Sequence, residues 1–214
     1  MKDLISFKYE LQNLITGNDA EGQSHLIKTV QTYLKTNHLS GSKAEGQQYT
    51  RPEEERSLIF FATKNNLWID ETSFGTYITE GAEQKIYFPE NADYVIKLAD
   101  AIFYLRWLDY FNNLLLHNSF FKNTAYELVG FFRDKEKLFA VLKQPFIEAT
   151  KLTEIENIKK FLLANGFEHK KNNDYYHPLL GIILEDLHDE NILTNKGVLF
   201  FVDTVIYITE EFHK

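Results

Sequence analysis

The chain has 214 residues, 44% of them hydrophobic, and carries a formal net charge of −8. Its length predicts one domain or two closely packed lobes, and its composition excludes a disordered chain. The negative charge argues against a nucleic-acid partner, and the lack of cysteine excludes disulfides and thiolate chemistry. No signal peptide and no apolar run of membrane length is visible, so we expect a cytoplasmic protein with no membrane partner.

The first 66 residues predict helices. Gln23–Thr36 places its apolar side chains on one face at helical spacing. Thr50 and Glu53 have the spacing of a capping box, which predicts a helix over Arg51–Lys64. These helices carry no recognisable chemistry, so we expect residues 1–66 to form a structural brace.

From Leu67 the pattern changes to that of strands. Residues 75–88 predict a hairpin that bends at Gly81, and Asp93–Leu98 predicts a buried strand containing Lys97. A lysine within an apolar strand is costly to bury unless an anion pairs with it, so Lys97 is a candidate for contact with phosphate. Gly81 is either a plain turn residue or part of a loop over that phosphate.

A long helix and a second hairpin are predicted next. Ala101–His117 has a wide apolar face, and its only internal acid, Asp109, is either a counter-ion for Lys97 or a surface acid. Residues 126–141 predict the hairpin. A further helix is predicted to start at Thr153 and to end at Asn165 and Gly166.

The stretch Gly181–Val205 alternates apolar runs with a loop rich in oxygen ligands. It predicts a strand hairpin that presents Asp186, Asn191 and Asp203 along one edge. Three oxygen ligands on rigid strands suit Mg²⁺, although a polar turn with satisfied side chains is the alternative. A role in solubility does not readily explain why Asp203 directly follows five apolar residues. This position therefore favours the metal site.

These residues resemble the protein-kinase-like superfamily. The pattern D-L-H-x-x-N-I-L is similar to that of aminoglycoside and fructosamine kinases, and to kinase-like domains in polyvalent proteins of bacterial mobile elements. The resemblance implies that Asp186 accepts the proton of a substrate hydroxyl, while Asn191 and Asp203 hold Mg²⁺. Lys97, in V-I-K, and Gly81 would contact the phosphates of ATP.

The resemblance covers roughly Leu67–Ile208. It implies an α+β, protein-kinase-like two-lobe fold with an antiparallel N-lobe sheet, a truncated C-lobe and N-terminal helices. The predicted domains are the brace at 1–66, the N-lobe at 67–147 and the C-lobe at 148–214. From their order along the chain, the remaining nucleotide-binding residues are Asp109, on the helix that pairs with the strand lysine, and Gln144, Phe146 and Glu148, at the hinge that meets adenine.

The sequence also departs from the kinase pattern. The predicted phosphate loop has one glycine in place of three, the long helix has no glutamate, and Thr204 and Val205 replace the usual Phe-Gly. The favoured function is an ATP- and Mg-dependent phosphotransferase acting on an unidentified small-molecule or protein hydroxyl. The alternatives are a degenerate kinase that binds a nucleotide or partner without turnover, and a metal-dependent hydrolase using Asp186, His188 and Asp189.

Overall fold

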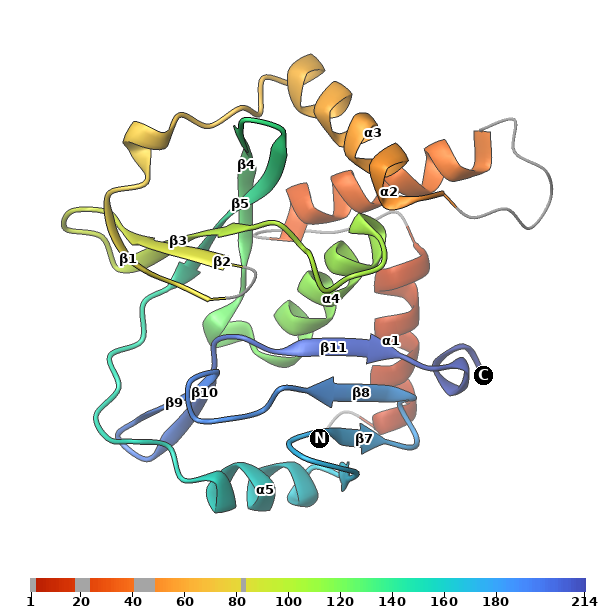
Figure 1. Cartoon of the computed structure of the whole chain (residues 1–214). Helices are drawn as coiled ribbons and strands as arrows, with labels where there is room; N and C mark the ends of the chain where they lie inside the picture. Colours follow the sequence, from red (N-terminus) through yellow and green to blue (C-terminus); the bar gives the residue numbers. More distant parts are fainter. Residues whose placement is uncertain (1–2, 18–23, 41–48, 82–83) are drawn as a thin grey trace. The chain divides into compact units, whose positions relative to one another are not determined.

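The computed structural model describes residues 3–17, 24–40, 49–81 and 84–214, and Figure 1 shows a mixed arrangement of helices and antiparallel strands. The chain divides into two compact units. We call residues 18–115 and 125–146 the sheet unit, and residues 1–17, 116–124 and 147–214 the hairpin unit. Each unit is described separately below.

Three helices precede the strands. They are α1 (Leu4–Thr16), α2 (His25–Ser40) and α3 (Arg51–Lys64). The predicted bounds of α3 are confirmed, and its capping box is present: the backbone N–H of Thr50 donates to Glu53 Oε2 at 2.7 Å. Helix α1 belongs to the hairpin unit and α2 and α3 to the sheet unit, so the expected brace is shared between the units.

A five-stranded antiparallel sheet forms the centre of the sheet unit. Its strands lie in the order β1-β2-β3-β5-β4, and the predicted hairpin at Gly81 is the β1–β2 pair. Apolar side chains alternate along the strands and build a core on one face of the sheet. The strands are β1 (Thr76–Glu80), β2 (Gln84–Phe88), β3 (Tyr94–Ala99), β4 (Glu127–Asp134) and β5 (Lys137–Pro145).

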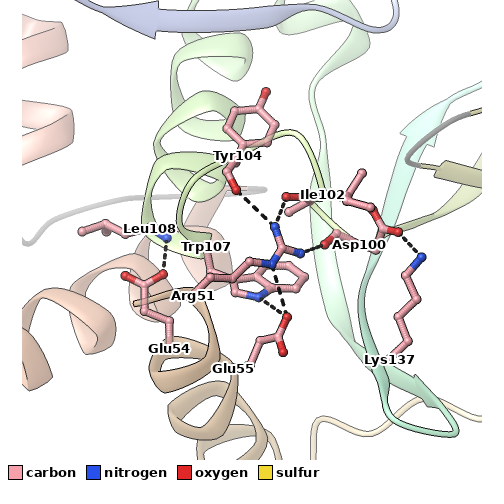
Figure 2. A network of polar contacts seen from close by, with 10 residues as sticks. Arg51, Glu54, Glu55, Asp100, Ile102, Tyr104, Trp107, Leu108 and Lys137 are labelled. Carbon is pink, nitrogen blue, oxygen red and sulfur yellow. Dashed lines mark hydrogen bonds and ion pairs between the residues drawn. The ribbon is translucent and has the colours of Figure 1, made fainter. Parts of the chain in front are cut away.

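Helix α4 (Trp107–Phe120) begins later than the predicted start at Ala101. Figure 2 shows the reason: the guanidinium of Arg51 donates to the backbone carbonyls of Asp100, Ala101 and Tyr104. Ala101 is itself in the left-handed region, with φ of 53°. These carbonyls face a side chain of α3 and the backbone turns sharply, so the segment cannot start a helix.

Side chains of α3 also satisfy the first turn of α4. The carboxylate of Glu54 accepts a hydrogen bond from the backbone N–H of Leu108 at 3.2 Å, and Glu55 accepts one from the indole of Trp107 at 3.2 Å (Figure 2). Burial raises the pKa of Glu54 to about 7, against the effect of this helix N-terminus. Helix α3 therefore acts as an external cap for α4.

The hairpin unit contains a four-stranded antiparallel sheet, in the order β11-β8-β7-β6, and the separate β9–β10 hairpin. The β9–β10 hairpin lies within the stretch predicted to form one, whereas β6, β7 and β11 were not predicted. The strands are β6 (Glu168–His169), β7 (Tyr175–His177), β8 (Ile182–Glu185), β9 (Ile192–Asn195), β10 (Val198–Phe201) and β11 (Val205–Ile208).

Helix α5 (Ile155–Ala164) completes the hairpin unit. Short 3-10 turns of three or four residues lie elsewhere in the chain. Its N-cap is Glu154 and its first residue is Ile155, so the predicted start at Thr153 is two positions too early. The hydroxyl of Thr153 instead pairs with that of Thr194 at 2.8 Å. Among the helices described, none has the length and apolar character that crossing a membrane requires.

Candidate active site

The loop between β8 and β9 carries Asp186 and Asn191. The side-chain amide of Asn191 donates to the backbone carbonyl of Asp186 and to its Oδ2 atom, both at 2.9 Å. Asp186 adopts the left-handed region, with φ of 60°, which a short polar side chain tolerates. This conformation turns the backbone carbonyl oxygen and the Oδ2 atom of Asp186 toward Asn191. The Asp186 side chain remains 61% exposed.

Backbone contacts anchor this loop. Leu187 is buried, and its N–H donates to the carbonyl of Asn173 at 3.3 Å. The carbonyl of His188 accepts from the N–H groups of Asn191 and Ile192 at 3.1 and 3.0 Å. The polar side chains of the loop are therefore held above a buried apolar residue.

Asp203 lies at the same end of this unit, in the short break between β10 and β11. The carbonyl of Asn191 accepts from the N–H groups of Val202 and Asp203, at 2.9 and 3.2 Å. Asn191 thus contacts Asp186 through its side chain and Asp203 through its backbone. The structure brings together the three residues that the sequence placed on one edge.

This arrangement fits a magnesium ion. The amide nitrogen of Asn191 is directed at Asp186, so the Oδ1 atom of Asn191 and the carboxylate of Asp203 are the groups that could hold such an ion. Mg²⁺ takes one or two such ligands and fills its shell with water and phosphate oxygens. Over the described ranges, no three side chains of His, Cys, Asp or Glu gather as a metal site.

His188 belongs to the same polar cluster. Its Nε2 atom lies 3.4 Å from Asp186 Oδ1 and 3.0 Å from the side-chain nitrogen of Asn191. This histidine was not predicted to take part in a kinase site, although it lies only two residues after Asp186 in the sequence. A ring in this position limits the rotamers open to the Asp186 carboxylate.

In the sheet unit, Lys97 lies on β3 opposite Leu142 of β5 and is only 4% exposed. Because side chains alternate along a strand, it points away from the face that carries Ile96 and Leu98. Its ammonium group lies 5.4 Å from the ring centroid of Tyr126. Burial of an ammonium group is costly unless other groups compensate its charge.

Asp109 and Gly81 also lie in the sheet unit. Asp109, in the first turn of α4, forms a two-pronged ion pair at 2.7 and 3.1 Å with Arg106, which directly precedes the helix. Gly81 is exposed at the end of β1, and its N–H donates to the carbonyl of Gln84 at 2.9 Å. A Cβ atom at Gly81 would meet no atom within 4 Å, so the described fold accepts a larger residue there.

The three predicted hinge residues are Gln144, Phe146 and Glu148. The chain passes from one unit to the other directly after Phe146. Gln144 is buried in β5. The N–H of Phe146 donates to Asp93 at 2.9 Å, still within the sheet unit. The carbonyl of Glu148 accepts from the side chain of Asn195 at 2.7 Å, in the hairpin unit.

A surface hollow of about 450 Å³ lies elsewhere in the sheet unit. It carries the carboxylates of Glu55, Asp100 and Glu136. Its two cations, Arg51 and Lys137, already pair with Glu55 and Asp100. This charge balance offers no net attraction to a polyphosphate, and none of the predicted nucleotide-binding residues lines the hollow.

Comparison with known families gives one result. The model of the Kinase-PolyVal family, described as serine/threonine/tyrosine kinase found in polyvalent proteins, matches residues 51–210. The matched region runs from α3 into the last 3-10 turn and includes Lys97, Asp186, Asn191 and Asp203. It confirms the resemblance and the kinase-like α+β fold. No curated protein matches the chain.

Proposed function

The chain belongs to the family of serine/threonine/tyrosine kinases found in polyvalent proteins, and from this membership we propose that it transfers the γ-phosphoryl group of ATP to an acceptor hydroxyl. In this reaction the acceptor oxygen forms a bond to the γ-phosphorus and the bond to the ADP oxygen breaks. The proton of the hydroxyl passes to Asp186.

The proposed roles follow from the chemistry of each side chain. Asp186 is exposed enough to meet an acceptor, and Asn191 and His188 fix its carboxylate. Asn191 and Asp203 would hold Mg²⁺, which neutralises phosphate charge when bound. Lys97, buried in β3, would pair with the phosphates.

One observation supports this proposal most strongly. Asn191 bonds to Asp186 Oδ2 through its side chain at 2.9 Å and accepts from the N–H of Asp203 at 3.2 Å. A base and a metal ligand are thereby linked through a single residue. Positioning of this kind is the main contribution that a protein makes to phosphoryl transfer.

A second function is a nucleotide-binding module with little or no turnover. Two observations favour it. The predicted phosphate loop has a single glycine, at an exposed position whose geometry does not require one. The only acid inside the predicted helix, Asp109, is engaged by Arg106. Both would weaken the alignment of phosphates without abolishing binding.

Two measurements test the proposal. We expect ATP with Mg²⁺ to raise the melting temperature of the wild-type protein, because a ligand that binds the native state stabilises it. We expect the wild type to transfer label from γ-labelled ATP to itself or to water. Asp186→Asn should lower this rate at least 100-fold, because proton transfer by a positioned base contributes about 10²–10⁴-fold.

Asp189→Asn is the matched control. Asp189 is an exposed acid in the same loop, and its carboxylate lies 4.0 Å from His188 Nδ1. This variant should keep the wild-type rate within about threefold, since an exposed ion pair of this length contributes little. A shift in melting temperature without turnover would support the binding module instead. The absence of both would reject a nucleotide site.

A further inference from the structure

Three buried polar side chains lie behind the segment that carries Asp203. They are His117, Thr124 and Thr204, with exposed fractions of 0%, 1% and 2%. All three belong to the hairpin unit, and none has a role in the transfer step proposed above. Polar groups buried this deeply are costly unless they bond to one another.

The geometry fixes how these groups bond when the ring of His117 is neutral. Its Nε2 atom lies 3.0 Å from the carbonyl of Thr124, and a carbonyl can only accept, so the ring proton is on Nε2. The Nδ1 atom lies 2.8 Å from the hydroxyl of Thr204, which therefore donates to it. The hydroxyl of Thr124 donates to the carbonyl of Phe201 at 2.5 Å.

These bonds hold the Asp203 segment on both sides of the acid. Phe201 is fixed by Thr124, and its ring stacks on Phe121 with centroids 4.3 Å apart. Val202 and Asp203 donate their N–H groups to Asn191, as described above. Thr204, directly after Asp203, is held by His117. The acid sits between two anchored neighbours.

We propose that His117 is a positioning residue for Asp203, acting through the hydroxyl of Thr204. This inference rests on the proposed function, in which Asp203 holds Mg²⁺. The hydrogen bond between Thr204 and this histidine of α4 fixes the backbone from which the Asp203 carboxylate projects.

The test separates the hydroxyl of Thr204 from its size. Thr204→Val keeps the shape and removes the hydroxyl, whereas Thr204→Ser keeps the hydroxyl. Mn²⁺ binding in the presence of ATP is measured by electron paramagnetic resonance. We expect Thr204→Val to weaken Mn²⁺ affinity at least tenfold, because loss of such a supporting bond costs about 10–100-fold. Thr204→Ser should stay within about threefold of the wild type.

Thr194→Val is the control for lost stability alone. Thr194 is buried in the same unit and shares a hydroxyl hydrogen bond of 2.8 Å with Thr153. The Thr194→Val variant should lose stability as Thr204→Val does, and it should keep the Mn²⁺ affinity of the wild type. Equal affinities in the two valine variants would overturn the inference. Failure of the wild type to bind Mn²⁺ with ATP would instead reject the proposed function.

A measurement on the wild type covers the case in which Thr204→Val does not fold. Nitrogen-15 NMR of the histidine rings reports which nitrogen carries the proton. We expect His117 to be protonated on Nε2, with an unprotonated, hydrogen-bonded Nδ1. An Nδ1 atom that takes part in no hydrogen bond would contradict the link to Thr204 whatever the variants do.

Discussion

Glu54, in the sheet unit, combines complete burial with a strongly raised pKa. It is fully buried, it accepts from the N–H of Leu108, and Arg106 and Asp109 of α4 act on its charge. Burial is the largest effect, and it raises the pKa to about 7 from an ordinary value of 4.5. The folded protein therefore favours the neutral acid more than the unfolded chain does.

The sign of the pH dependence follows from this shift. Stability from Glu54 is fully present below pH 4.5 and is lost as the pH rises toward 7, because only the unfolded chain ionises there. Glu54→Gln keeps an acceptor for Leu108 and cannot ionise. We expect it to match the wild type in urea unfolding at pH 4.5 and to exceed it by roughly 2 kcal/mol at pH 8.

Glu136→Gln provides the comparison for this prediction. Glu136 is exposed in the turn between β4 and β5 and pairs only at the surface with Arg133. Its difference from the wild type should stay within about 0.5 kcal/mol at both pH values. A Glu54→Gln variant that is less stable at pH 8 than the wild type would mean that the fold holds Glu54 as an anion.

Residue spacing predicted part of the candidate site and could not predict the rest. Asp186, Asn191 and Asp203 flank the β9–β10 hairpin, so their proximity could be deduced from local pattern alone. The contact between His117 and Thr204 joins residues 87 positions apart, and nothing in either local sequence indicates it. The pairing of Asp109 with Arg106 depends on where α4 begins. The sequence pattern predicted this start too early.

At the level of elements, periodicity predicted most helices and strands correctly. Helix α3 and the β1–β2 hairpin have strong local signals, a capping box and alternation around a turn. The start of α4 was wrong because the apolar residues of the preceding segment imitate a helix, whereas Arg51 holds that segment open from α3. Strand β11 was missed because its partner β8 is distant in sequence.

Two glycines allow the effect of a left-handed backbone conformation to be distinguished from the effect of steric crowding. Gly181 and Gly197 both have left-handed φ angles, 66° and 83°. A Cβ atom at Gly181 would lie 2.2 Å from the backbone nitrogen of Phe212, whereas one at Gly197 would meet nothing within 4 Å. The first glycine therefore lets the C-terminal 3-10 turn approach β8, and the second only shapes the β9–β10 turn.

Alanine substitutions should reveal this difference. We expect Gly197→Ala to cost about 1–2 kcal/mol, from the left-handed conformation alone. Gly181→Ala should cost about 3 kcal/mol or more, because a backbone clash adds to the same strain. Midpoints of urea unfolding measure both. Equal losses would show that the 3-10 turn moves away without penalty, so that crowding at Gly181 has no energetic effect.

At the level of the whole molecule, the units are interleaved along the chain. The hairpin unit collects three separate segments, and α4 supplies residues to both units. Helix α1 lies outside the region matched by the family, yet it is part of the hairpin unit. Its Lys8 and Gln12 side chains donate to the carbonyls of Glu211 and Phe212 at 2.7 and 2.5 Å.

This connectivity predicts that the two units unfold together. Both tryptophans, Trp68 and Trp107, belong to the sheet unit, so fluorescence follows that unit while circular dichroism follows the whole chain. Leu11 is buried on α1, and Leu11→Ala should cost about 2–5 kcal/mol. We expect its fluorescence and circular dichroism midpoints to fall together, since melting either unit removes the packing of half of α4.

Leu4→Ala, at an exposed position of α1, is the control and should change the free energy of unfolding from either signal by less than about 0.5 kcal/mol. A fluorescence midpoint that stays at the wild-type value in Leu11→Ala would instead mean that the sheet unit is stable by itself.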